Sequence, residues 1–266
     1  MRFYSPAWLR SDLTQVLAFV GLLVLFGAAA VAGAGAMPYR WQWHRVPAFL
    51  YREFNGAFYA GPLMKGLVVT LVISVWSFAV ALLAGLVAAL LRLSDSIIGR
   101  AVARGYIELV RNTPLLVQLY LFYFVLAPIL GIDRQTTAIL CLGLFEGSFG
   151  AEIIRAGILA IPRGQWEAAG ALGLARWQLY GFVVLPQALR VMVPPITSLA
   201  ISVVKHSAIV SAIAIFDLAN EGRTIIADTF MTFEVWLTVA AIYLVVTTAL
   251  SVLASWLERR YARSSS

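Results

Sequence analysis

Charged side chains are scarce in this sequence. Only 12% of its 266 residues are Asp, Glu, Lys or Arg, whereas a soluble domain contains about 25%. Hydrophobic residues make up 61%, and the mean hydropathy is +0.87. These values exclude an ordinary soluble protein and predict a chain that lies in a bilayer. The net charge of +7 does not indicate a nucleic-acid partner, because the arginines gather in loops and near the C-terminus, as the positive-inside rule predicts.

Cysteine and cofactor motifs are equally sparse. Cys141 is the single cysteine and lies in an apolar run, so it is expected to be an inert small hydrophobe without a disulfide partner in this chain. The sequence contains no Walker A loop and no His/Cys cluster at metal-ligand spacing. We therefore expect no enzymatic activity, no metal and no other cofactor in this chain. An internal repeat is also missing, so a pathway built from two halves requires a second chain.

Long apolar runs are what the sequence does contain. Six of them are long enough to cross a bilayer as helices. They cover residues 13–36, 63–91, 107–130, 137–160, 188–216 and 235–256. The fold predicted from them is all-α, that of a polytopic membrane protein with about six transmembrane helices.

The first apolar run has a competing interpretation as a secretory signal peptide. Arg2 and Arg10 precede it, and Ala34, Gly35 and Ala36 resemble a cleavage site. The run is longer than the apolar region of a usual signal peptide, which favours a retained helix.

Basic residues indicate which loops lie in the cytoplasm. The short basic segment 92–104 belongs there, and so do the three arginines at 259, 260 and 263. Both termini are therefore expected in the cytoplasm. The segments 37–60 and 217–234 are then external loops, although the first carries three arginines of its own.

A more polar island at 167–186 separates two of the apolar runs. Its alanines and leucines favour helix, while Gly173 permits a tight bend or a close backbone approach. Pro186 is expected to end the second short helix and to open the next apolar run. The island predicts a helix–glycine–helix element that docks a partner at the membrane face.

This island resembles the EAA motif of the permeases of ABC importers. The matching residues are Glu167, Ala168, Ala169, Gly173, Leu185 and Pro186, with valine at 183 where isoleucine is usual. The resemblance implies that the loop 161–187 forms coupling helices that sit in a cleft of an ATPase subunit.

Four further segments resemble the permeases of polar amino acid importers. They cover residues 65–71, 111–118, 151–155 and 204–209. The second segment contains Thr113, a candidate substrate-binding residue. The last reads V-K-H-S-A-I, where the acidic amino acid permeases commonly have V-K-N-S-A-I, so His206 replaces an asparagine. This segment favours acidic or amide amino acids as substrates, as in a glutamate/aspartate-like permease.

The resemblance covers about residues 59–261 and implies a type I ABC importer permease core in the bacterial cytoplasmic (inner) membrane. Residues 1–58 are then an extra transmembrane helix with a periplasmic loop, and 262–266 a tail. The implied partners are two copies of an ATPase that binds ATP and Mg, a second permease chain (identical or related), an external substrate-binding protein, a polar amino acid and membrane lipid. An ion-driven secondary carrier or a membrane enzyme is the alternative, but a carrier predicts a repeat and an enzyme a nucleophile or metal constellation.

Charged residues inside the spans are costly and require a partner, a cavity or a function. Glu152 and Arg155 lie three residues apart, so they form an ion pair or, alternatively, contact substrate. Glu146 lies six residues before Glu152 and is therefore expected on a different helix face from it. There it receives the ammonium of an amino acid, or it is a protonated or paired carboxyl. Lys205 and Ser207 are candidates for binding a substrate carboxylate. His206 is a candidate pH sensor or a packing residue.

Overall fold

The computed structural model describes residues 12–54 and 56–263. It is 84% helical, which confirms the all-α prediction. The chain divides after Gln42 into two compact units. By length and composition, five of the described helical segments can cross a membrane, or six if one bent pair counts as a span.

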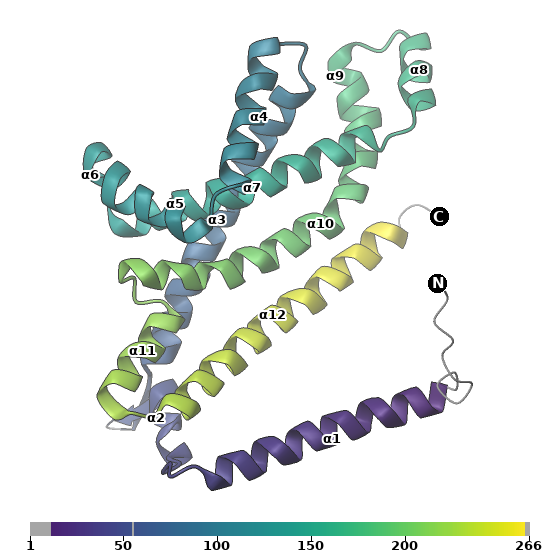
Figure 1. The fold of residues 1–266 in the computed structure, drawn as a ribbon. Coiled ribbons are helices and arrows are strands. Elements are labelled where there is room, and N and C mark those ends of the chain that lie inside the picture. Colours follow the sequence, from purple (N-terminus) through teal and green to yellow (C-terminus); the bar gives the residue numbers. More distant parts are fainter. Residues whose placement is uncertain (1–11, 55, 264–266) are drawn as a thin grey trace, which may run out of the picture. The chain divides into compact units, whose positions relative to one another are not determined.

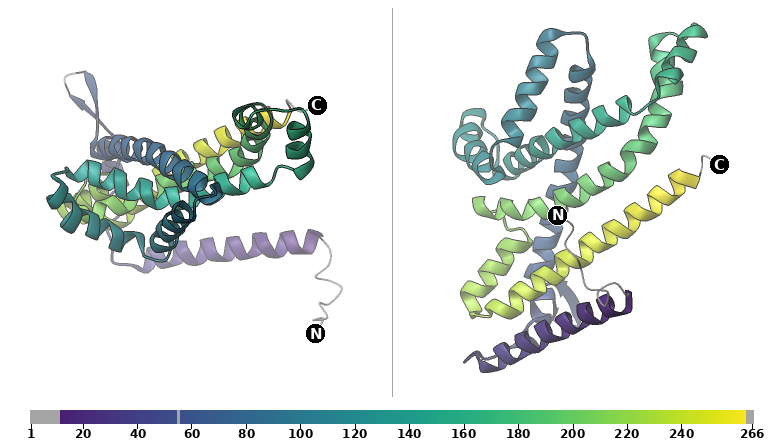
Figure 2. Two further views of the ribbon diagram at one scale, coloured as in Figure 1. Left: turned by 90° about the horizontal axis from the view of Figure 1, so that it is seen from above. Right: turned by 45° about the vertical axis from the view of Figure 1, so that its right-hand side comes forward.

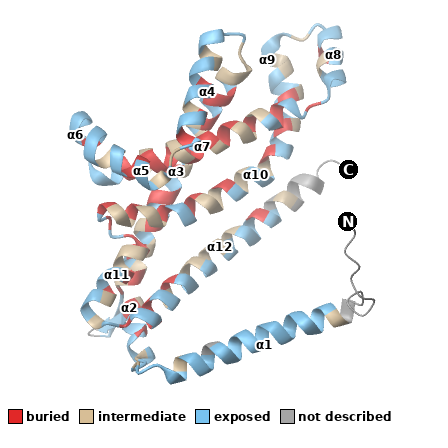
Figure 3. Ribbon diagram, in the orientation of Figure 1, coloured by how far each residue is buried: buried red, intermediate tan, exposed pale blue. Residues whose placement is uncertain are grey.

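The first unit consists of α1 (Asp12–Ala36) and the coil that follows it. Its candidate span has a mean hydropathy of 2.5, and none of the apolar window is buried, so nearly all its side chains are exposed in Figure 3. A helix that is apolar all round is typical of a span surrounded by lipid. Arg2 and Arg10 lie outside the described residues.

The second unit contains all remaining elements (Figure 1). In chain order these are η2 (Trp43–Arg45), α2 (Pro47–Leu50), β1 (Tyr51–Phe54), β2 (Ala57–Ala60), α3 (Pro62–Leu93), α4 (Ile97–Arg111), α5 (Leu115–Leu121), η3 (Phe122–Leu126), α6 (Ala127–Leu130), α7 (Arg134–Leu159), α8 (Arg163–Ala171), α9 (Arg176–Gln178), η4 (Leu179–Val184), α10 (Leu185–His206), η5 (Ser207–Ile213), α11 (Leu218–Thr229) and α12 (Thr232–Arg263). Within this unit α4, α8 and α9 lie at one end, and α2 and α11 lie at the other (Figures 1 and 2).

Small residues let α3 and α7 pack closely at the centre of this unit. A Cβ added at Gly143 would lie 2.5 Å from the Val80 side chain, and one added at Gly147 would lie 3.0 Å from Ala84. On α3, a Cβ at Gly85 would lie 3.0 Å from the Ala151 nitrogen. These small residues therefore let the two helices approach closely.

A small β-hairpin interrupts the otherwise helical chain. Strands β1 and β2 pair antiparallel, with Tyr51 opposite Ala60 and Phe54 opposite Ala57. Gly56 lies in the turn with a φ of 74°, a conformation that glycine adopts without strain. The sequence analysis predicted only an irregular external loop here, although the aromatic residues of both strands favour extended structure.

The span predicted over 107–130 is present only as a bent pair of helical segments. The chain bends by 107° between α4 and the helical segment 115–130. Pro114 lacks an N–H and disfavours helix at Thr113. The Gln118 amide donates to the Val110 and Thr113 carbonyls at 2.7 and 2.9 Å, which satisfies backbone groups freed by the break. Most of the expected loop 92–104 is therefore the start of α4.

The expected helix boundary at Pro186 is also wrong. The chain forms one candidate span over Arg176–Ile213, which includes the π-helical segment η4. Pro186 removes one backbone donor near the start of α10, and the side chain of Gln187 donates to the Val183 carbonyl at 2.8 Å. The helix thus continues across the proline from the polar island into the membrane.

The expected external loop 217–234 contains a helix. Asp217 caps α11 by accepting from the backbone N–H groups of Ala219 and Asn220 at 3.3 and 3.0 Å. The N–H of Leu218 donates to the Thr70 hydroxyl on α3 at 3.1 Å, so α11 is fixed to the core. The last helix α12 reaches Arg263, but the side chains of the arginines at 259, 260 and 263 lie outside the described residues.

Candidate functional site

The predicted helix–glycine–helix element is present: α8 and α9 are joined by a turn at Gly173. Gly173 has a φ of 71°, and its N–H donates to the Gly170 carbonyl at 3.0 Å. The N–H of Leu174 donates to the Ala169 carbonyl at 3.2 Å. These two bonds form a Schellman motif, which ends α8 and turns the chain through a left-handed residue.

One face of this element holds it to the unit and another is free. Ala169 is buried, whereas Glu167 and Ala168 are exposed. Trp166 donates from Nε1 to the Ile161 carbonyl at 3.3 Å and stacks edge-on against Tyr180 at 5.6 Å. The element is therefore fixed from behind and presents its EAA residues outward.

Large apolar side chains are also exposed along this element. Leu172 is 78% exposed, Trp177 69% and Phe182 68%. Leu185 and Pro186 are exposed further along the same helical run. Apolar surface of this kind at a polar loop is typical of a protein–protein contact site.

A second feature is a cavity of about 260 Å³ between α7 and α10. It is lined by Glu146, Phe149, Ile153, Pro195, Ser198, Leu199, Ser202 and His206. Three of the α10 residues (Ser198, Ser202 and His206) follow one another at four-residue spacing and so share a helix face. The two serines were not predicted from the sequence, although their four-residue spacing from His206 is a signal that could have found them.

The structure brings together two residues that the sequence analysis considered separately. Glu146 is 2% exposed, and its Oε1 lies 2.5 Å from Nδ1 of His206. The His206 side chain is 49% exposed and lines the cavity. Phe145 lies edge-on to the imidazole at 6.1 Å. The paired carboxyl considered for Glu146 is thus observed.

The other candidate residues lie outside this pair. Lys205 is exposed and, in the part of the chain that the structure describes, makes no ion pair. Ser207 is fully buried, and its hydroxyl donates to the Val204 carbonyl at 2.7 Å. Thr113 is held in the bend, where its hydroxyl donates to the Leu109 carbonyl and accepts from Gln118.

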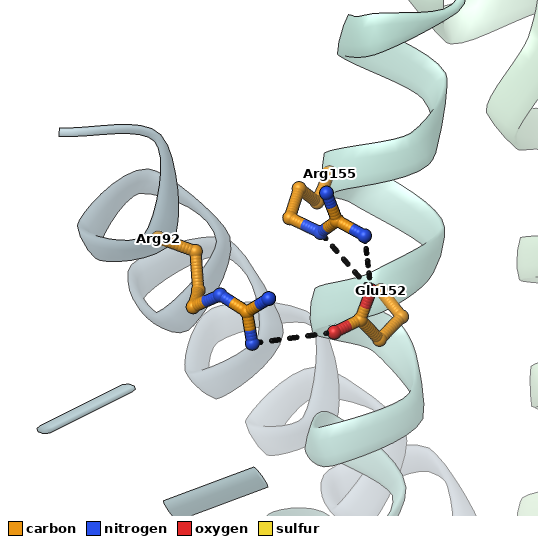
Figure 4. Close-up of polar contacts among 3 residues, drawn as sticks. All are labelled: Arg92, Glu152 and Arg155. Carbon is orange, nitrogen blue, oxygen red and sulfur yellow. Dashed lines mark hydrogen bonds and ion pairs between the residues drawn. The ribbon is translucent and has the colours of Figure 1, made fainter. Parts of the chain in front are cut away.

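Glu152 is the centre of a three-residue ion network rather than a cavity residue (Figure 4). Arg155 donates to Glu152 Oε2 from two nitrogens at 3.0 and 2.9 Å, which confirms the predicted pair. Arg92 approaches Oε1 at 3.5 Å from the end of α3. The sequence analysis missed Arg92, because only the packing of α3 on α7 brings it near.

The pKa values of two aspartates that cap helices outside the candidate spans are shifted in opposite directions. The Thr136 hydroxyl and backbone N–H hold the pKa of Asp133 below its usual value. Burial raises the pKa of Asp217 to about 6, although backbone N–H groups oppose this shift. Among the described residues no group of three or more His, Cys, Asp or Glu side chains lies close enough to hold a metal.

Comparison with known proteins identifies the family to which this chain belongs. Residues 81–263 match the family described as "Binding-protein-dependent transport system inner membrane component". The chain belongs to this family. It is an ABC transporter permease of the amino acid importer group, as the relatives below show.

This chain covers nearly the whole length of its relatives in this group. The glutamine transport system permease protein GlnP of Escherichia coli (strain K12) is 39% identical over 201 residues, 74% of this chain and 92% of that protein. The glutamate/aspartate import permease protein GltJ of the same organism is 32% identical over 235 residues, 83% of this chain and 94% of that protein.

A solved structure confirms the fold of the permease core. The crystal structure of an amino acid ABC transporter with histidines contains a chain that is 38% identical and superposes with a TM-score of 0.70. The match covers 75% of this chain and 94% of that one. The predicted type I ABC importer permease fold is therefore confirmed.

Proposed function

We propose that this permease forms the translocation pathway of an ATP-driven importer of polar amino acids, with acidic and amide amino acids favoured. The observation that carries the proposal is the cavity between α7 and α10, where the buried Glu146 carboxyl, the half-exposed His206 imidazole paired with it and two serines line an otherwise apolar space. A few polar groups in an apolar pocket are what orient a small polar ligand. The names of GlnP and GltJ supply the substrate class.

Coupling to ATP hydrolysis belongs to the α8–Gly173–α9 element. Its backbone is fixed by the Schellman motif, and its exposed apolar residues offer a surface to a partner. An ATPase dimer that closes on ATP moves this element. Because α9 continues through η4 into α10, the motion reaches the cavity without passing through a flexible loop.

The remaining partners follow from the same architecture. A second permease chain, identical or related, completes the pathway. Two ATPase subunits bind the ATP and Mg, and an external binding protein delivers the substrate. Figure 1 shows α4, α8 and α9 at one end of the second unit and α2 and α11 at the other; in this proposal the first end faces the cytoplasm and the second faces the binding protein. We expect both termini in the cytoplasm of a bacterial inner membrane, as the positive-inside rule predicts.

The candidate residues divide into two groups within this proposal. His206 lines the cavity, where it is paired with Glu146, and Lys205, the residue before it, is exposed; both suit a substrate carboxylate. Glu152, Ser207 and Thr113 are engaged in the permease's own bonds and act by holding helices in place.

Uptake by proteoliposomes that contain the permease, its ATPase and its binding protein tests the substrate class. Glutamate, aspartate, glutamine and asparagine are compared with arginine, lysine and histidine. Uptake of the first group supports the proposal, and Lys205→Met is expected to weaken it. Uptake of the second group alone would contradict the proposed substrate class and would leave the family assignment intact.

A further inference from the structure

The Glu146–His206 pair leaves one polar atom directed to the cavity. Nδ1 of the imidazole is occupied by the Glu146 carboxyl at 2.5 Å, and the ring is half exposed where it lines the cavity. In the described ranges the Glu146 contact is the ring's one hydrogen bond. The nitrogen that remains available to a ligand is therefore Nε2.

We propose that Nε2 of His206 is the substrate-reading atom of this permease, and that Glu146 is a positioning residue that sets whether Nε2 donates or accepts a hydrogen bond. This inference rests on the proposed transport function and adds a specificity device to it. The substrate group concerned is the carboxylate or amide oxygen of an acidic or amide amino acid.

The proton count of the pair determines the character of Nε2. With one shared proton the pair is either carboxylate and imidazolium or carboxylic acid and neutral imidazole. In both arrangements Nδ1 faces Glu146 and Nε2 carries a hydrogen, so Nε2 donates and the pair is neutral. When that proton is lost, the remaining ring hydrogen stays on Nδ1 against the carboxylate. Nε2 then only accepts, and the pair carries one negative charge.

These two states favour different ligands. The neutral pair donates to a carboxylate or amide oxygen. The anionic pair repels a carboxylate and, at Nε2, meets another acceptor, whereas it favours an ammonium group. The loss of one hydrogen bond together with the added repulsion changes affinity by roughly tenfold or more. Transport of acidic amino acids is therefore expected to fall as pH rises, whereas an amide side chain can also donate to Nε2 and is expected to respond less.

Other charged groups near the pair are already engaged or point elsewhere. On α7, Glu152 is bound by two arginines. From α4, Arg111 lies over the Phe149 ring at 4.8 Å, and the Tyr106 hydroxyl donates to the Leu144 carbonyl at 2.5 Å.

The α10 and α12 helices contribute two further charges. Lys205 precedes His206 on α10 and is exposed. Glu258 on α12 accepts from the Thr197 hydroxyl at 3.1 Å. In the described part of the chain, His206 is the one side chain that hydrogen-bonds Glu146.

The test is ATP-driven glutamine and glutamate uptake between pH 6 and pH 8, at saturating binding protein. Wild-type permease is compared with Glu146→Gln, His206→Asn and His44→Asn. The last variant removes the only other histidine, which is exposed in η2. Every variant is assembled with the same ATPase and the same binding protein, so differences between variants arise in the permease.

Wild type and His44→Asn are expected to lose glutamate uptake about tenfold from pH 6 to pH 8, with a smaller loss of glutamine uptake. His206→Asn is expected to flatten this profile, because the amide that it introduces donates at every pH. Glu146→Gln is expected to flatten it too, since no carboxyl remains to share a proton. Equal pH profiles in all four proteins would overturn the inference while ATP-driven uptake stood. Absence of ATP-driven uptake by wild type at any pH would instead overturn the proposed function.

A spectroscopic readout separates this role from a purely structural one. In protein labelled with ¹⁵N-histidine, His206→Asn identifies the signals of His206, because only two histidines are present. We expect hydrogen on Nε2 at pH 6 and on Nδ1 alone at pH 8, and Glu146→Gln to abolish the Nδ1-only state. An Nε2 hydrogen that persists unchanged at pH 8 would contradict the inference, even if the variants transported poorly.

Discussion

At the residue scale, Asp217 combines two opposing demands. Its carboxylate caps α11 and is fully buried. Burial raises its pKa from 3.8 to about 6, which corresponds to about 3 kcal/mol at most between the two protonation states. Because the native state holds its proton more tightly than the unfolded state, stability falls as pH rises from about 4 to about 6 and changes little above that.

Asp217→Asn is therefore expected to remove this pH dependence. Asparagine caps helices about as well as aspartate, so the backbone contacts persist while the buried charge disappears. Thermal unfolding in detergent at pH 4.5 and pH 7 measures the effect. Wild type should have the lower Tm at pH 7, and the variant should gain most there. An equal pH response in both proteins would show that another group causes it.

Glu152 is the second residue whose substitution is expected to lower the stability of the protein. It accepts three contacts from Arg92 and Arg155, and its side chain is 29% exposed. Glu152→Gln leaves two arginines near each other without their shared carboxylate. We expect a loss of about 1–3 kcal/mol, or a Tm lower by roughly 2–10 °C.

Glu167→Gln is the matched control for this substitution, because Glu167 is exposed and takes part in no ion pair within the described part of the chain. Its Tm should stay within about 2 °C of wild type, as is usual for surface changes. A double-mutant cycle with Arg92→Met should show coupling to Glu152. Additive effects would mean that the two helices do not communicate through this pair.

At the element scale, the turn at Gly173 in the proposed coupling loop has a backbone conformation that restricts which side chain can stand there. Its φ of 71° is strained for a β-branched residue. Gly173→Val is expected to distort the turn and to reduce transport at least tenfold while the transmembrane core stays folded. ATP hydrolysis and uptake, measured together, give the number of substrates moved per ATP.

Gly170→Val provides the control for that experiment. Gly170 lies in α8, and an added Cβ there meets nothing within 4 Å, so only the ordinary helix cost of valine applies. Its coupling ratio should remain near wild type. Equal losses in both variants would show that added bulk on the loop, and not the turn geometry, causes the defect.

Sequence reasoning succeeded where one element determines its own structure. Apolar run length predicted most spans because a lipid environment requires helices, and Gly173 predicted its turn because the left-handed conformation is a property of that residue. Pro114 is compatible with a kink, but the size of the 107° bend was not predicted, because Gln118, four residues beyond Pro114, supplies the capping that makes it stable. The Glu146–His206 contact joins residues 60 positions apart, which spacing along the chain does not reveal.

At the scale of the whole molecule, the chain divides after Gln42 into two compact units, and the family match lies in the second. The family match starts at residue 81, and GlnP is covered to 92% by 201 residues of this chain. A core made of residues 43–266, fused to a cleavable signal peptide that delivers Trp43 to the external face, is expected to assemble and transport within about twofold of wild type. Loss of assembly after this truncation would assign α1 a structural role in the complex.

The energy source is the measurement that tests the central claim most directly. Proteoliposomes with the permease, ATPase and binding protein are loaded with ATP, with a non-hydrolysable analogue, or with an imposed Na⁺ or H⁺ gradient and no nucleotide. The account predicts glutamine or glutamate uptake only with hydrolysable ATP and only when the binding protein is present. Uptake driven by an ion gradient through the permease alone would contradict it and would identify a secondary carrier.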